Sequence, residues 1–205
     1  MSNETRVQLA PAAIAYASPA TGLRNAGIVL AASAFVAVCA HVALPLYFTP
    51  VPLTLQPFAV LLLGLLLSPR LAGGALAAYL AEGAMGLPVF TPGPMTAPGL
   101  AHLFGPTGGY LLAYPAAAML ISFLWRRSQR GFSAAVVSAA AGNLMILAGG
   151  AAWLAVLTHG SAQMVLTQSI VPFLPGDALK VAAAAALATG WQRLRRRTTP
   201  SHLTN

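Results

Sequence analysis

Residues 108–130 read GGYLLAYPAAAMLISFLWRRSQR, an apolar run of membrane-spanning length followed at once by three arginines. A transmembrane helix needs about 20 predominantly apolar residues, and Lys and Arg concentrate on its cytoplasmic side. This stretch therefore predicts a membrane helix, Gly108–Trp125, whose C-terminal end faces the cytoplasm.

The composition of the whole chain agrees with this interpretation. Of its 205 residues, 58% are hydrophobic and only 7% are charged, whereas about 25% of a soluble domain is charged. Six apolar stretches can be drawn: Asn25–Leu44, Leu53–Ser68, Leu71–Met85, Gly108–Trp125, Ser133–Leu157 and Asp177–Gln192. We predict an all-α polytopic membrane protein with six transmembrane helices in one domain, residues 25–192, between a cytoplasmic lead-in (1–24) and a basic cytoplasmic tail (193–205).

Two features predict irregular structure within this helical domain. The second and third stretches are shorter than a full span, and Pro50, Pro52 and Pro57 enter the second. Residues 91–104 contain three prolines and two glycines but no formal charge, so they predict an apolar capping loop or re-entrant segment instead of a helix. Irregular backbone at membrane depth must be shielded by protein, and cavities form in such regions.

The arginines give an orientation. They precede the first stretch and follow the second, fourth and sixth, whereas the alternate connections, residues 45–52, 87–106 and 158–172, contain no Lys, Arg, Asp or Glu. By the positive-inside rule both termini are cytoplasmic and the uncharged connections face outward. The net charge of +8 and the pI near 10.9 therefore reflect basic loops beside the lipid bilayer, and we expect no nucleic acid partner.

Three ionisable side chains inside the helical domain are the main functional candidates. Between residues 25 and 192 the only acidic residues and lysines are Glu82, Asp177 and Lys180. A charge at the centre of a membrane helix costs about 2.5–3.5 kcal/mol, so such residues usually serve function. Asp177 and Lys180 are three residues apart and can pair on one helix face. They suit a ligand with an amide-like group or a carboxylate on an apolar body, although Asp177 could also simply complement the helix N-terminus.

The other candidate ligand contacts are weaker. Glu82 can contact a ligand, serve as a membrane-interface carboxylate, or pair with a Thr hydroxyl. The amide of Gln56 can bind a ligand or satisfy loop carbonyls. Gly108 and Gly109 permit a close approach of the backbone, and Tyr110 offers an aromatic wall with one polar tip. The histidines have no metal-ligand spacing, so we expect no metal site.

Small residues follow one another along the first stretch. Gly27 with Ala31, and Ser33 with Ala37, lie one helical turn apart. Such faces allow close contact with another membrane helix. The partner helix can belong to another chain or to the same bundle, and internal packing is the commoner case.

Three segments carry a resemblance to a known family. They are PLTLQPFA (52–59) with GAMGLPVF (83–90), GPTGGYL (105–111) and PFLPGDALK (172–180). Together they resemble BioY, the biotin-binding S component of energy-coupling-factor (ECF) vitamin transporters, over roughly residues 25–192. One motif alone would be a weak signal, but three in order at plausible spacing are specific.

The resemblance implies a six-helix protein of the bacterial inner membrane that captures biotin from outside. It implies two kinds of partner, a T-component membrane scaffold and two ABC-type ATPase subunits, and no cofactor besides the transported ligand. The chain has no Walker A sequence, as expected if ATP is hydrolysed by the partners.

The matching positions imply roles for individual residues. Asp177 and Lys180 match the polar pair of the family's last-helix motif, and Gly108, Gly109 and Tyr110 match its glycine-tyrosine motif. Phe90, which ends the first segment, is a further predicted ligand contact. We hypothesise that Asp177 accepts a ureido N–H of biotin and that Lys180 donates to a ligand oxygen, in either orientation of the ligand. Residues 91–104 depart from the glycine-rich stretch of the family, so the sequence does not assign ligand contacts there.

Two other functions are weighed against this one. An intramembrane enzyme would also use acids in a cavity, but the chain has no Gly-x-Ser-x-Gly, no His-Glu-x-x-His and no aspartate cluster. We therefore predict that it is not an enzyme. A stand-alone small-molecule transporter would need access from both sides and often shows internal repeats, which the sequence lacks.

Overall fold

The structure is a computed structural model that describes residues 19–93 and 97–198. Its helices are α1 (Pro19–His41), α2 (Gln56–Leu66), α3 (Pro69–Ala84), the 3-10 helix η1 (Gly99–Phe104), α4 (Gly108–Arg127), α5 (Phe132–Thr158), α6 (Ala162–Ser169) and α7 (Leu174–Thr198), and its strands are β1 (Ala43–Leu44) and β2 (Leu53–Thr54). The described chain is thus mainly helical, as predicted.

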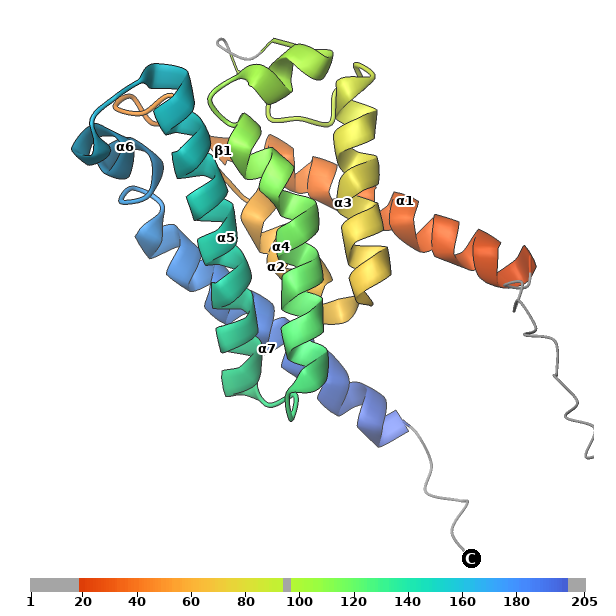
Figure 1. Cartoon of the computed structure of the whole chain (residues 1–205). Helices are drawn as coiled ribbons and strands as arrows, with labels where there is room; N and C mark the ends of the chain where they lie inside the picture. Colours follow the sequence, from red (N-terminus) through yellow and green to blue (C-terminus); the bar gives the residue numbers. More distant parts are fainter. Residues whose placement is uncertain (1–18, 94–96, 199–205) are drawn as a thin grey trace, which may run out of the picture.

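The bundle is built around the α4–α5 hairpin. These two helices lie side by side, and α3 packs on the other flank of α4 while α7 crosses behind the hairpin (Figure 1). The short helix α2 packs against α1, α4, α5 and α7 in the interior. Its buried residues, such as Ala59, Val60 and Leu61, are completely shielded, so the apolar sequence of α2 serves the protein core.

Local sequence explains where the two short helices begin. Pro57 lies in the first turn of α2. Backbone N–H groups in a first turn have no partner within the helix, so the N–H that proline lacks costs no hydrogen bond. Ser68 caps α3, since its side-chain oxygen accepts a hydrogen bond from the Leu71 amide, and Pro69 is the first helical residue. The chain can therefore turn between α2 and α3 within two residues.

The lengths of the helices bear on how the chain crosses a membrane. Within the described residues, three segments are long and apolar enough to span it alone, Ala20–His41, Gly108–Arg127 and Phe132–Thr158. α6 and α7, which meet at a bend of 47°, count as a fourth if the pair forms one span. α2 and α3 have 11 and 16 residues, or about 16 and 24 Å. An all-α membrane protein is therefore confirmed, and six crossings stay a prediction.

The connections contain structure that differs from the prediction. β1 pairs antiparallel with β2, so residues 43–44 and 53–54, assigned by sequence to two helices, form a small hairpin. η1 and α6 lie where irregular loops were expected. The last helix begins at Leu174, three residues before the predicted start. β1, β2, η1 and α6 have two to eight residues each, too few to show a periodic pattern in the sequence.

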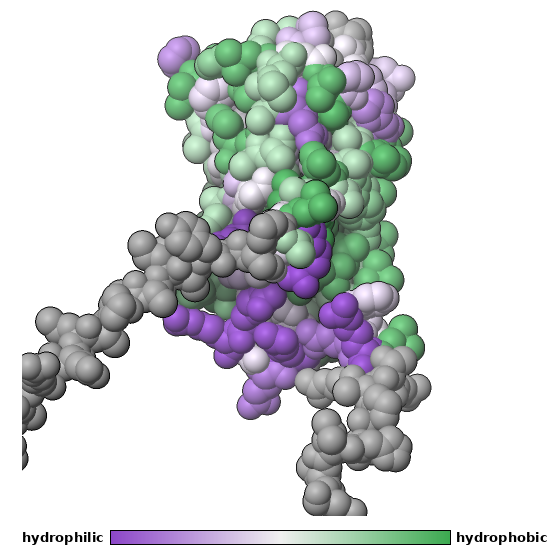
Figure 2. Space-filling view, turned by 90° about the vertical axis from the view of Figure 1, so that its right-hand side faces the viewer, coloured by the Kyte–Doolittle hydropathy of each residue, from purple (hydrophilic) through white to green (hydrophobic). Residues whose placement is uncertain are grey.

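Polar surface gathers at one end of the molecule. Figure 2 shows hydrophilic residues at the lower end, below a largely apolar body. Arg126 and Arg127 end α4, Arg130 follows it, and Arg193 and Arg195 lie in the last turns of α7. The bundle therefore has one basic end, opposite the end that carries η1 and α6 (Figure 1).

Candidate functional site

A cavity lies between the β1–β2 hairpin and the outer halves of α4, α5 and α7. Its wall is formed by Val51, Pro52, Thr54, Gln56, Pro57, Thr107, Tyr110, Leu111, Tyr114, Ile146, Leu147, Phe173, Asp177 and Lys180. The wall is thus mostly apolar and aromatic with a few polar groups, which is the usual composition of a small-molecule pocket.

The charged part of the wall is the pair predicted from sequence. The Nζ atom of Lys180 donates to Oδ1 of Asp177 at 3.0 Å, and both side chains are almost fully buried. Asp177 lies in the first turn of α7, so its charge is also stabilised by the helix dipole. The pair is neutral overall, and each member keeps hydrogen-bonding capacity beyond this one contact.

Asn143 of α5 stands behind this pair. Its Nδ2 donates to Oδ2 of Asp177 at 3.1 Å, and its Oδ1 is buried without a hydrogen-bond partner among the described residues. The two carboxylate oxygens of Asp177 are therefore held from two different helices. Sequence analysis missed Asn143, although a polar amide in the middle of the apolar stretch 133–157 itself indicates a side chain that needs a buried hydrogen-bond partner.

Aromatic side chains form another part of the cavity wall. The hydroxyl of Tyr110 donates to the carbonyl oxygen of Ser169 at 2.7 Å, and its ring lies edge-on to Phe173 at 6.2 Å. Tyr114, one turn further along α4, also lines the cavity and was not predicted. The predicted aromatic wall at Tyr110 is present, but its polar tip binds the end of α6.

Gln56 joins the cavity to the outer loops. Its Nε2 donates to the Tyr79 hydroxyl at 2.6 Å, and its Oε1 accepts from Thr54 and Thr91 at 3.2 and 3.0 Å. The Tyr79 hydroxyl in turn donates to the carbonyl of Val89 at 3.0 Å. Gln56 therefore lies in the cavity wall and also ties residues 89–91 to α2 and α3. Its amide donates to the Tyr79 hydroxyl instead of a loop carbonyl, and its contact with ligand stays a prediction.

Phe90 belongs to the outer cap and is absent from the cavity wall. Its ring is edge-on to Tyr79 at 5.4 Å and stacks in a tilted arrangement on His102 at 4.8 Å. A Cβ atom on Gly83 would lie 2.1 Å from Cζ at the tip of this ring, so glycine at this position lets Phe90 pack closely against α3. The loop predicted to cap the bundle is thus anchored by an aromatic stack.

Gly108, Gly109 and Glu82 also lie outside the cavity wall. A Cβ on Gly108 would lie 1.9 Å from the Leu103 carbonyl oxygen, and one on Gly109 would lie 2.2 Å from Cβ of Trp153. Both glycines therefore allow close packing, and their contact with ligand stays a prediction. Glu82 accepts a hydrogen bond from the Ser33 hydroxyl on α1, which links α1 to α3.

The four small residues of α1 are divided between two surfaces. Ser33 is completely buried and Ala37 packs against the core, whereas Gly27 and Ala31 are exposed. Ser33 therefore faces its own bundle, and the structure leaves only Gly27 and Ala31 open to a neighbour.

Metal-ligating side chains do not cluster in the described part of the chain. No three His, Cys, Asp or Glu side chains of the described residues lie close enough to hold an ion together. The chemistry of the cavity therefore depends on Asp177, Lys180, Gln56 and the aromatic wall.

Known proteins resemble this chain in sequence and in fold. The model of the BioY family matches residues 9–197. A protein of Thermotoga maritima named biotin transporter BioY is 35% identical over 79% of this chain and 92% of its own length, and biotin transporter BioY2 of Lactococcus lactis subsp. cremoris is 34% identical over 78% and 85%.

The solved structures include a close match in fold. A crystal structure described as the S-component for biotin from an ECF-type ABC transporter superposes with a TM-score of 0.76 at 26% identity, covering 88% of this chain and 95% of that one. These proteins are named as transporters or as a transporter component and not as enzymes, which agrees with the prediction from sequence. By sequence and by fold, the chain belongs to the BioY family.

Proposed function

We propose that this chain is the S component of an ATP-driven ECF importer, and that it captures biotin in the cavity between the β1–β2 hairpin, α4, α5 and α7. The observation that carries the proposal is the buried Asp177–Lys180 pair in a mostly apolar wall. Family membership supports it, because relatives of this chain are named biotin transporters.

The chemistry of biotin suits this wall. Its ureido ring offers two N–H donors and one carbonyl acceptor, its sulfur ring is apolar, and its tail ends in a carboxylate. Asp177 accepts a ureido N–H, Lys180 donates to a ligand oxygen, and Tyr110, Tyr114 and Phe173 cover the apolar rings. Asn143 holds Asp177 in place from behind, so the carboxylate does not need to reorganise when ligand binds.

The proposed topology has six crossings, made by α1, α2, α3, α4, α5 and α7, with both termini in the cytoplasm of a bacterial cell. The arginines at the ends of α4 and α7 support this orientation. The exposed Gly27 and Ala31 on α1 offer a face for the T component, and ATP hydrolysis belongs to two partner ATPases.

Calorimetry on the purified chain in detergent tests ligand capture. We expect tight binding of biotin, no binding of thiamine, and at least tenfold weaker biotin binding by Lys180→Ala and by Asp177→Asn. Gln163→Ala, on the exposed face of α6, is the control and should bind like the parent chain. Failure of the folded parent chain to bind biotin would overturn the proposal, and full affinity of Asp177→Asn would remove Asp177 from the site.

Reconstitution tests the dependence on partners. In proteoliposomes we expect this chain alone to bind biotin without accumulating it, and to transport it only with the T component, the ATPases and ATP. Accumulation of biotin by the chain alone would make it a stand-alone transporter.

A further inference from the structure

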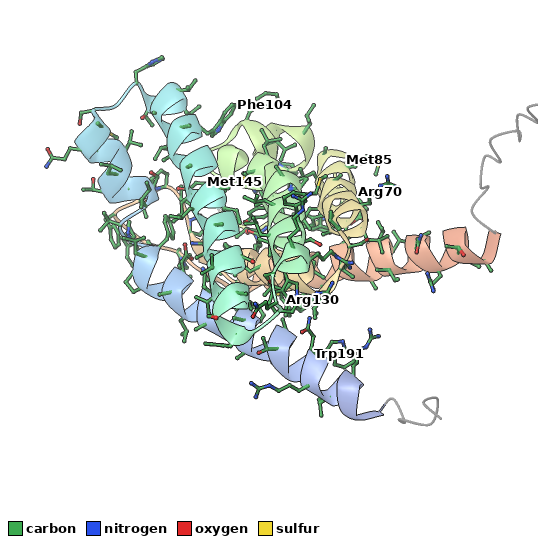
Figure 3. All side chains as sticks on the ribbon, turned by 60° about the horizontal axis from the view of Figure 1, so that its bottom comes forward. Arg70, Met85, Phe104, Arg130, Met145 and Trp191 are labelled. Carbon is green, nitrogen blue, oxygen red and sulfur yellow. The ribbon has the colours of Figure 1, made fainter. Side chains whose placement is uncertain are left out.

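A second cleft lies at the basic end, away from the proposed biotin cavity. It is formed where the end of α2, the end of α4 with the following turn, and the last turns of α7 meet, and it encloses about 750 Å³ including its opening. Its wall includes Leu66, Arg126, Arg130, Trp191, Gln192 and Arg195. Figure 3 shows Arg130 and Trp191 near each other at this end of the bundle.

The cleft concentrates positive charge beside an aromatic ring. Arg126 and Arg130 are exposed, and the Arg195 guanidinium lies 5.3 Å from the centre of the Trp191 ring. The acidic residues of the described part are Glu82 and Asp177, and Asp177 precedes Arg195 by 18 residues of one helix, about 27 Å. Neither carboxylate lies in the cleft wall, so the exposed charges of Arg126 and Arg130 suit an external anion.

The turn after α4 holds Arg130 at the cleft. Arg130 has a φ of 55°, the left-handed region that residues other than glycine seldom adopt. Ser128 stabilises this turn, since its hydroxyl donates to the Trp125 carbonyl at 2.8 Å and accepts from the Arg130 amide at 3.1 Å. These local hydrogen bonds therefore fix the backbone of the turn from which the Arg130 side chain extends to the cleft.

We propose that this cleft binds the phosphate of an anionic phospholipid in the adjacent leaflet. Arg126 and Arg130 contact the phosphate oxygens, for which guanidinium groups provide paired donors. The acyl chains run along Leu66 and Trp191, which are 40% and 52% exposed. A lipid fits better than a free phosphate because the cleft joins this apolar surface and carries a tryptophan, a residue typical of the membrane interface.

Native mass spectrometry of the delipidated chain, titrated with phosphatidylglycerol or with phosphatidylcholine of the same acyl chains, tests the proposal. We expect one phosphatidylglycerol to be retained in preference to phosphatidylcholine. Arg126→Gln/Arg130→Gln should bind it about 30-fold more weakly, since each arginine near anionic lipid contributes roughly fivefold. Arg70→Gln/Arg127→Gln removes the same charge outside the cleft and should change this binding less than threefold.

Two results would overturn the lipid site. Equal loss of lipid in both double variants would mean that the whole basic end attracts lipid diffusely. Displacement of the lipid by millimolar inorganic phosphate would assign the cleft to a soluble anion. Circular dichroism and monodisperse elution check the fold of each variant. The lipid measurement does not use biotin binding as a readout, so failure of the lipid site is distinguishable from failure of the proposed function.

Discussion

At the scale of single residues, the carboxylate of Asp177 organises the cavity. It receives Lys180 from its own helix and Asn143 from α5, and a buried charge-assisted hydrogen bond contributes about 1.5–3 kcal/mol. The spacing of Asp177 and Lys180 predicted their pairing from sequence. The third partner depends on how α5 packs against α7, which no local pattern encodes.

Replacing Asn143 tests this arrangement. We expect Asn143→Ala to weaken biotin binding about tenfold, because Oδ2 of Asp177 loses its partner and the carboxylate is no longer fixed. Calorimetry in detergent measures the effect. Ser138→Ala is the matched control on α5, since its hydroxyl bonds only to the Ala134 carbonyl of the same helix. Equal affinities of the two variants would contradict a positioning role.

His102 makes the outer cap sensitive to pH. Burial lowers the pKa of His102 below its ordinary value of 6.5, although a backbone hydrogen bond with Ala97 partly opposes this. Below pH 6.5 the unfolded segment therefore binds more protons than the folded one, so the stability of the cap falls as pH falls.

We expect hydrogen exchange of residues 97–104, corrected for intrinsic rates, to be faster at pH 5 than at pH 7. His102→Phe keeps a ring against Phe90 but cannot titrate, and its exchange should not depend on pH in this range. The same pH dependence in both proteins would exclude His102 as the cause.

At the scale of elements, the α4–α5 contact depends on glycine. A Cβ on Gly109 would lie 2.2 Å from Cβ of Trp153 and 2.4 Å from the Gly149 carbonyl oxygen, and the latter is backbone that cannot rotate away. We expect Gly109→Ala to destabilise the folded chain by about 2–3 kcal/mol by forcing the helices apart.

Thermal unfolding in detergent measures this loss. Gly27→Ala is the control, because a Cβ there meets nothing within 4 Å and alanine favours a helix. A melting temperature for Gly109→Ala equal to that of the control would show that α4 and α5 can separate without cost.

Sequence predicted the long elements well and the short ones poorly. Apolar length locates α1, α4 and α5, and the arginines at the ends of α4 and α7 locate these helix ends at one face of the membrane. The β1–β2 hairpin and α6 were missed, because strands of two residues and a helix of eight are stabilised by tertiary contacts. One such contact joins the hairpin to α6, since the Thr49 hydroxyl, between β1 and β2, donates to the Gln168 carbonyl at 2.7 Å.

At the scale of the whole molecule, the orientation in the membrane can be measured. Cys39 is the single cysteine and is buried, so Cys39→Ala is a suitable background for labelling. We expect an impermeant maleimide to label Gln163→Cys on α6 in intact cells, and to label Gln129→Cys, in the α4–α5 turn, only after permeabilisation. The reverse pattern would invert the proposed topology.

The shortness of α3 has a consequence for the surrounding lipid. Its 16 residues span about 24 Å, whereas the hydrocarbon core of a bilayer is about 30 Å thick. Ala77 and Ala81 on α3, and Met85 at its C-terminal cap, are exposed. The apolar surface on this flank is therefore shorter than the hydrocarbon core of the bilayer is thick. In the proposed topology, in which α3 crosses the membrane, this hydrophobic mismatch predicts that annular lipid is thinnest and most easily displaced on the α3 side of the molecule.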